Sequence, residues 1–143
     1  MDTENKVNTG AQAMLEINSE TVCRLIILAK EFHAQEAVVI PEEPGNPSGD
    51  WAQQMLASHV NDSSFAEFKS IVRDLEPDQQ HQLVALMWLG RGDYALDEWD
   101  DAVEYAADNA SATTAEYLIA HPMLADYFIE GLAAYGLGCE DEG

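Results

Sequence analysis

The chain has 143 residues, 47% of them hydrophobic, and a formal net charge of −21 from 27 acidic and 6 basic side chains. This length suits one compact domain, and the hydrophobic fraction is too high for a disordered chain. The scarcity of Lys and Arg excludes direct binding to nucleic acid, because each phosphate contact requires a cation. No apolar run reaches the roughly 18 residues that cross a bilayer, and the first residues lack the basic start of a signal peptide. We therefore expect a cytoplasmic protein without membrane contact.

The first part of the chain predicts a flexible tail followed by a helix. Residues 1–17 are polar and show no periodicity. From Val22 to Phe32, apolar residues then recur at helical spacing, and Ser19 is a suitable N-cap just before them. The pattern fades near Glu36, where we expect the helix to end.

A proline-rich segment separates this helix from the rest of the chain. Residues 38–50 contain three of the five prolines together with two glycines, which predicts an irregular loop. Asp50 could cap a short helix over residues 51–60.

The middle of the chain predicts two consecutive helices. Ser64-Phe65-Ala66-Glu67 has the hydroxyl and carboxylate spacing of a capping box. Pro77 suits the first position of the following helix, where its missing N–H is no loss. Residues 83–89 are apolar almost all round that helix, so it should be central in the fold. Gly90 and Gly92 should end it.

The last third predicts three more helices. Asp97 is a candidate N-cap for the first, and Thr113-Thr114-Ala115-Glu116 has capping-box spacing for the second. His121-Pro122 should interrupt the chain before a final helix, which Gly136 and Gly138 should stop.

The predicted fold class is therefore all-α: a compact bundle of about six or seven short helices with a Pro/Gly-rich loop after the first helix. The expected organisation is a single helical domain over residues 18–137, preceded by the tail and followed by an acidic C-terminal tail over residues 138–143.

Several runs in the second half resemble a known family. They are Trp-Leu-Gly-Arg-Gly-Asp over residues 88–93, Glu-Trp-Asp over 98–100, Thr-Ala-Glu-Tyr-Leu over 114–118 and Leu-Ala-Asp-Tyr over 124–127. They resemble domain-of-unknown-function family 3775, an uncharacterised bacterial family, over about residues 66–137. The resemblance implies a small bacterial protein and carries no activity, cofactor or site residue with it.

The two cysteines, Cys23 and Cys139, have no zinc-site spacing and no Cys-x-x-Cys partner. A disulfide between them is possible in principle. Because thiols stay reduced in the cytoplasm, we expect both to be free and structural or incidental.

Charge is distributed very unevenly along the chain. After Arg91 there is no Lys or Arg, but there are 13 Asp and Glu. On one continuous helix, six acids would fall within a stripe about 100° wide and spread over roughly 22 Å: Asp93, Asp97, Asp100, Asp101, Glu104 and Asp108. That is close to the phosphate spacing of a single DNA strand. These residues are the predicted partner-binding face. A merely solvated helix surface and loose attraction of divalent cations are the other interpretations.

No motif assigns a catalytic, cofactor-binding or metal-binding residue. The acids lack the spacing of a calcium loop, no pair of Glu-x-x-His motifs suggests a di-iron site, and no Gly-x-Ser-x-Gly motif is present. Gly90-Arg91-Gly92 is predicted to be a structural turn in which the glycines supply unusual backbone angles and Arg91 pairs with a nearby acid.

Three functions fit these observations. The first is a non-enzymatic, acidic helical interaction module that docks a basic protein, for example a nucleic-acid-binding protein whose polyanion it mimics. The second is an enzyme of unknown class whose site is assembled from residues distant in sequence. The third is a structural protein that forms a homodimer. An acidic ridge would favour the first, a deep polar pocket the second and a flat apolar patch the third.

Overall fold

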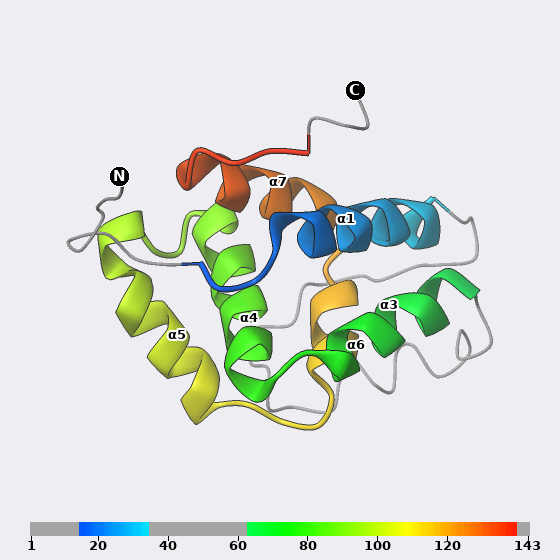
Figure 1. Ribbon diagram of the computed structural model, residues 1–143, viewed down its shortest axis with the longest axis horizontal. Helices are drawn as coiled ribbons and strands as arrows, with labels where there is room; N and C mark the ends of the chain where they lie inside the picture. Colours follow the sequence, from blue (N-terminus) through cyan, green and yellow to red (C-terminus); the bar gives the residue numbers. More distant parts are fainter. Residues whose placement is uncertain (1–14, 35–62, 140–143) are drawn as a thin grey trace, which may run out of the picture.

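A computed structural model describes residues 15–34 and 63–139, and within these ranges the chain forms six α-helices, one 3-10 helix and no strand (Figure 1). The all-α prediction is confirmed. No helix in these ranges is long and apolar enough to cross a membrane. The predicted loop over residues 38–50 and the predicted helix over 51–60 lie outside the described residues, as do most of the two predicted tails.

Helix α1 (Ser19–His33) begins one residue away from the predicted cap. The N-cap is Asn18, whose Oδ1 accepts a hydrogen bond from the backbone N–H of Glu20 at 2.7 Å. The predicted tail over residues 1–17 is wrong at its end, because Ile17 is only 4% exposed. The backbone N–H of Glu16 also donates to Oε1 of Gln82 at 2.8 Å, so this segment is tied to the core.

Helix α3 (Ser63–Asp74) packs against α1 and buries Phe65, Phe68 and Val72. The capping box predicted at Ser64 is wrong. Ser64 lies inside the helix, and its hydroxyl donates to the Glu31 carboxylate of α1 at 3.1 Å. The hydroxyl that was expected to accept a local backbone N–H instead donates to a carboxylate on another helix.

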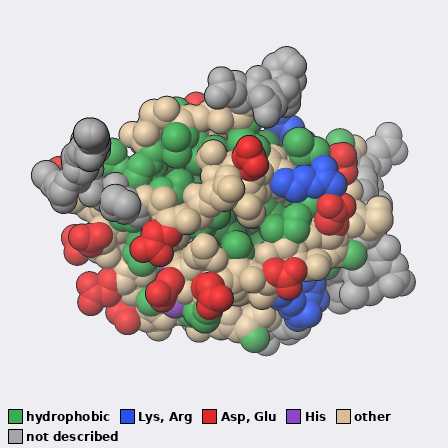
Figure 2. All heavy atoms as spheres, in the orientation of Figure 1, with side chains coloured by type: hydrophobic (Ala, Val, Ile, Leu, Met, Phe, Trp, Pro, Cys, Tyr) green, Lys and Arg blue, Asp and Glu red, His purple; other side chains and the backbone are tan. Residues whose placement is uncertain are grey.

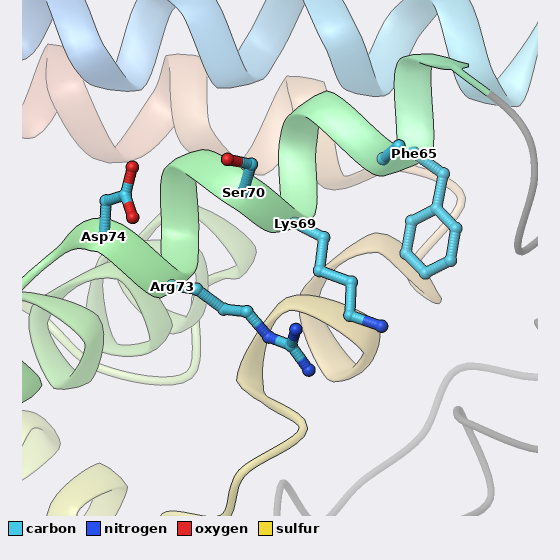
Figure 3. A pocket seen from close by; sticks show the side chains of 6 residues that line it. Phe65, Lys69, Ser70, Arg73 and Asp74 are labelled. Atoms are coloured by element: carbon cyan, nitrogen blue, oxygen red, sulfur yellow. The ribbon is translucent and has the colours of Figure 1, made fainter.

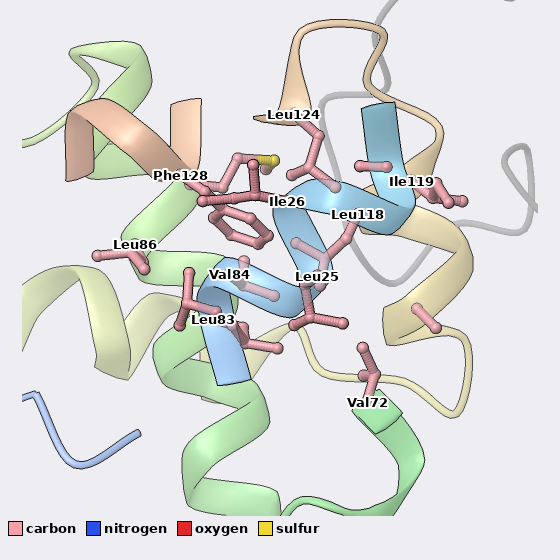
Figure 4. Packing of buried hydrophobic residues seen from close by; sticks show 14 of the residues in the cluster. Leu25, Ile26, Val72, Leu83, Val84, Leu86, Leu118, Ile119, Leu124 and Phe128 are labelled. Carbon is pink, nitrogen blue, oxygen red and sulfur yellow. The ribbon is translucent and has the colours of Figure 1, made fainter. Parts of the chain in front are cut away.

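Helix α4 (Pro77–Arg91) is the centre of the fold, as its apolar pattern predicted. Eight consecutive residues, 82–89, are buried, and the helix contacts α5, α6 and α7. Pro77 occupies the first helical position, after Glu76, whose backbone N–H donates to Oε1 of Gln79 at 3.0 Å. Figure 4 shows the residues of α4 within the cluster of leucine, isoleucine, valine and phenylalanine side chains that fills the core.

The two glycines predicted to end α4 have different roles. Gly92 is the C-cap, with φ of 95°, a conformation that favours glycine. Gly90 instead lies inside the helix without an unusual backbone angle, and a Cβ atom built there would be 1.7 Å from the carbonyl oxygen of Tyr127. Its role is therefore to let α4 approach helix α7 (Leu124–Ala134) closely. Gly131 of α7 faces the backbone of Leu86 in the same way.

The chain between α4 and α7 forms a 3-10 helix, η2 (Leu96–Glu98), followed by α5 (Trp99–Asp108) and α6 (Thr114–Ile119). The predicted N-cap role of Asp97 is wrong, because Asp97 lies inside η2 and the N-cap of α5 is Glu98. The capping box predicted over residues 113–116 is also wrong. Thr113 is the N-cap but makes no capping hydrogen bond through its side chain.

The predicted break at His121-Pro122 is confirmed, because these residues separate α6 from α7. The His121 ring is fully buried, and its Nδ1 donates to the Tyr117 carbonyl at 2.9 Å. Gly136, with φ of 77°, ends α7 as predicted, and the next residue donates its N–H to the carbonyl of Leu132 at 2.9 Å.

The expectation of two free cysteines is wrong. Cys23 of α1 and Cys139, after α7, form a disulfide with their Cα atoms 5.6 Å apart. Their separation of 116 residues gave no indication of this contact. The packing of α1 against α7 brings the two cysteines together.

His33 should make the fold sensitive to mild acid. Its Nε2–H donates to the carbonyl of Ile119 at 2.7 Å, and burial, which outweighs this hydrogen bond, lowers the pKa of the imidazole. The unfolded state therefore binds a proton more readily, and the free energy of unfolding should fall as the pH drops below about 6.5. Urea denaturation at pH 7.5 and 5.5 checks this, with His33→Gln expected to lose less stability than the wild type over that interval. An equal loss in both proteins would contradict it.

Candidate functional site

The six acids of the predicted partner-binding face are all exposed. Figure 2 shows carboxylates gathered over α5, whereas Lys and Arg side chains lie on the other side of the view, over α1 and α3. The residues of this acidic face are Asp93, Asp97, Asp100, Asp101, Glu104 and Asp108.

The six acids do not lie on one helix, so the face differs from the single helical stripe that one continuous helix would give. Asp93 lies in the turn after α4, where its carboxylate binds the guanidinium of Arg91 at 2.7 Å. Asp97 belongs to the 3-10 helix η2, and the remaining four acids lie on α5. At a rise of 1.5 Å per residue, these four cover about 12 Å along the helix. The stripe of roughly 22 Å would have required one helix through all six acids, and the structure divides them among a turn, η2 and α5.

The opposite side of α5 attaches the face to the core. Trp99, Ala102 and Ala106 are buried, and Val103 is partly buried. These residues lie about half a turn away from the α5 acids, so the helix is amphipathic with its carboxylates directed to solvent.

An aromatic group that the sequence did not indicate lies beside the acids. Trp88 of α4 packs against Tyr94, with ring centroids 5.9 Å apart, and against Tyr105 of α5 at 5.5 Å. The indole N–H of Trp88 donates to the hydroxyl of Tyr117 at 3.1 Å, which fixes the tryptophan in the core. Tyr105 is 50% exposed. The acidic face therefore includes a half-exposed aromatic ring with rigid support beneath it.

The negative charge of the face acts on Tyr94. Burial raises the pKa of its phenol, and Tyr105 and the carboxylates of Asp93, Asp101 and Glu98 raise it further. These carboxylates are thus close enough to Tyr94 for their field to oppose a further negative charge. A cation at the same place would be favoured.

The predicted structural turn, Gly90-Arg91-Gly92, joins this face to α4. Arg91 pairs with Asp93, one of the acids expected for it, and its guanidinium carbon also lies 6.0 Å from the centre of the Tyr127 ring. The arginine thus anchors the start of the face to α7 and is neutralised locally.

A second polar site lies between α3 and α6. Lys69 of α3 binds the Glu116 carboxylate at 2.9 Å, and the Glu116 side chain is only 4% exposed. Oε1 of Glu116 has no hydrogen-bond partner within the described ranges. Beside this ion pair, residues of α3 line an open pocket of about 310 Å³ (Figure 3). Lys69 and Arg73 project from the same side of the helix there.

The described ranges bring no His, Cys, Asp and Glu side chains together in a group of three that could hold a metal ion. His33 and His121 each bond to a backbone carbonyl, and His59 lies outside the described residues. A second shallow pocket of about 250 Å³ is lined in part by Lys30, His33 and Asp126.

Comparison with known families matches residues 65–137 to the family described as "Protein of unknown function (DUF3775)", which agrees with the resemblance drawn from the sequence. The matched region includes every residue of the acidic face and the whole of α4 to α7. No curated protein and no solved structure matches the chain.

Proposed function

Because the chain belongs to the DUF3775 family, whose function is unknown, its role has to be argued from its own surface, and we propose a non-enzymatic interaction module that docks a basic protein on the acidic face. The proposal places this module in the cytoplasm of a bacterium, with neither a membrane nor nucleic acid as its direct partner.

The observation that carries the proposal is the uncompensated charge of α5. Within the described ranges, none of the carboxylates of Asp100, Asp101, Glu104 and Asp108 forms an ion pair. Two like charges about 6 Å apart in water repel each other by about 0.7 kcal/mol before salt screening. A Lys- or Arg-rich partner would relieve this repulsion. Its binding free energy would therefore include the repulsion energy that the acids have in the isolated protein.

Tyr105 adds a reason to prefer a cationic peptide to a simple cation. An Arg or Lys over an exposed aromatic ring gains about 0.5–1 kcal/mol, and Arg also stacks its flat guanidinium on the ring. The Tyr105 ring is half exposed and rests on Trp88, so it is already oriented for such a contact.

The spacing of the acids supports mimicry of a polyanion. Four carboxylates over about 12 Å of helix give one charge per roughly 4 Å, compared with one per 3.4 Å on a DNA strand. The preferred partner is therefore a protein that itself binds nucleic acid through Lys and Arg.

Neutralising the face tests the proposal directly. The test variant carries Asp97→Asn, Asp100→Asn, Asp101→Asn, Glu104→Gln and Asp108→Asn. The matched control removes five exposed acids elsewhere, with Glu20→Gln, Asp74→Asn, Asp78→Asn, Asp126→Asn and Glu130→Gln. The probe is a fluorescent Arg- and Lys-rich peptide, titrated at about 20 and 150 mM NaCl. We expect the test variant to weaken binding at least about tenfold and the control to weaken it much less.

Mimicry has its own readout in the same assay. The wild-type protein should displace a short DNA duplex from the peptide, and the test variant should not. Equal weakening by both variants would show that net charge alone attracts the peptide, and binding that ignores salt would also contradict the proposal.

A homodimer is supported by a separate observation. Ile27 of α1 and Ile129 of α7 are each 38% exposed, and α1 packs against α7. Light scattering of the wild type and of Ile27→Glu tests for a homodimer, because a dimer that buries Ile27 would dissociate in the variant. Peptide binding by the acidic face would persist in the same variant.

A further inference from the structure

The disulfide joins a helix that is packed into the core to a segment that has few other contacts with the fold. Cys23 lies in α1, where neighbouring residues such as Val22 and Leu25 are fully buried. Cys139 ends a segment that runs back from α7 toward α1 (Figure 1). Residues 136–138 of that segment are exposed, and the bond from the N–H of Leu137 is the last backbone hydrogen bond within the described ranges. The disulfide is therefore the main link that holds this segment in place.

The end of α7, just before this segment, contacts the buried side of the helix that carries most of the acidic face. Tyr135, at the end of α7, packs edge-on against Trp99, with ring centroids 5.3 Å apart. Trp99 is the first residue of α5 and is almost fully buried. The Tyr135 hydroxyl is buried and has no hydrogen-bond partner within the described ranges, so packing alone keeps the ring there. A bond that holds the end of α7 in place therefore also keeps Tyr135 packed against Trp99 at the start of α5.

We propose that Cys23 and Cys139 form a redox latch that fixes the C-terminal segment on α1 and, through Tyr135 and Trp99, the start of α5. In the closed state the disulfide holds the Tyr135 ring on Trp99. In the open state the segment is released and the first turn of α5 opens more often. That the latch tunes docking on the acidic face, and that it opens reversibly in the cell, rest on the proposed function and its compartment, whereas the disulfide and the Tyr135–Trp99 contact do not.

The chemistry needs only a small-molecule disulfide and its thiol. The thiolate of one cysteine attacks the disulfide oxidant, forms a mixed disulfide and releases one small thiol. The second cysteine, as its thiolate, then attacks the mixed disulfide, which forms the Cys23–Cys139 bond and releases the second small thiol. Two protons and two electrons leave the protein, and the oxidant takes them up. Both cysteines are partly buried, so neither is sealed from a reagent of this size.

Reversibility follows from the proposed compartment. Disulfides in the cytoplasm of mesophiles are usually transient and catalytic or redox-sensing, because the glutathione and thioredoxin pools reduce them. Cys139 lies after α7 and outside any helix, so the disulfide can open while the buried residues of α4 and α7 stay packed.

The test uses the full chain in mixtures of reduced and oxidised glutathione. Alkylation and mass measurement give the disulfide fraction, and amide hydrogen exchange is followed by mass spectrometry. We expect the pair to convert between dithiol and disulfide within the glutathione range. On reduction, exchange should become roughly tenfold faster in the end of α7 and the first turn of α5, and change little in α4. Cys139→Ser under oxidising conditions should match the reduced wild type.

Three outcomes would overturn the latch: no disulfide at any glutathione ratio, a disulfide that opens only when the whole protein unfolds, or unchanged exchange in α5 on reduction. Tyr135→Ala in the oxidised protein distinguishes the disulfide from the Tyr135–Trp99 contact. This variant should speed exchange at the start of α5 while the disulfide stays intact. None of these measurements uses a binding partner, so failure of the latch and failure of the proposed docking are distinguishable.

Discussion

Gly90→Ala should destabilise the protein by about 1–3 kcal/mol or more, the usual effect of overpacking a core. The added Cβ would lie 1.7 Å from the carbonyl oxygen of Tyr127 and 2.9 Å from the backbone nitrogen of Gly131. Both neighbours are backbone atoms of α7, so relief requires the two helices to separate. In an unpacked helix the same change would instead stabilise by about 1 kcal/mol, because Ala is the better helix former. A loss of stability in Gly90→Ala therefore indicates close contact between α4 and α7, whereas a gain would indicate that the two helices are apart at this position.

Guanidinium denaturation measures this difference, and Gly138→Ala is the control. A Cβ at Gly138 meets no atom within 4 Å, so that variant should match the wild type closely. Gly131→Ala should also destabilise, because its Cβ would lie 2.6 Å from the carbonyl oxygen of Leu86. A Gly90→Ala protein as stable as the wild type would show that α4 and α7 are farther apart than described.

Lys69→Met should destabilise the protein by about 3 kcal/mol, because it leaves the Glu116 carboxylate buried without its cation. Glu116 is 4% exposed and Lys69 is 25% exposed, so water compensates the lost ion pair poorly. The expected loss of stability is at the low end of the range for buried ion pairs, because Lys69 retains some contact with solvent.

The exposed pair Arg24–Glu67 is the matched control. Its side chains are 46% and 48% exposed, so Arg24→Met should lower the free energy of unfolding far less than Lys69→Met. Adding Glu116→Gln to Lys69→Met should restore part of the lost stability, because a neutral amide is buried at less cost than a charge. Equal effects of Lys69→Met and Arg24→Met on the free energy of unfolding would contradict a buried role for Glu116.

The candidate site was predicted from the sequence in part. Periodicity indicated that the acids around α5 would face solvent, and each of the six is exposed. It did not indicate Tyr105, because that ring acquires its role from Trp88, 17 positions earlier on another helix. The helical projection also placed all six acids on one helix, although Asp93 lies at the predicted turn, where its carboxylate pairs with Arg91.

The sequence by itself determined the all-α class, the central place of α4 and the break before α7. Each follows from a local signal: apolar residues all round a helix, Pro77 at a first helical position, and His121-Pro122 between two patterns.

Only the tertiary structure decided which partner each polar side chain takes. Ser64 and Glu116 both have capping spacing, but their bonds go to Glu31 and Lys69 on other helices. The pairing of Cys23 with Cys139 and the close approach at Gly90 likewise depend on helices distant in sequence. A local pattern gives the partners within one turn, whereas packing adds competing partners that no spacing along the chain reveals.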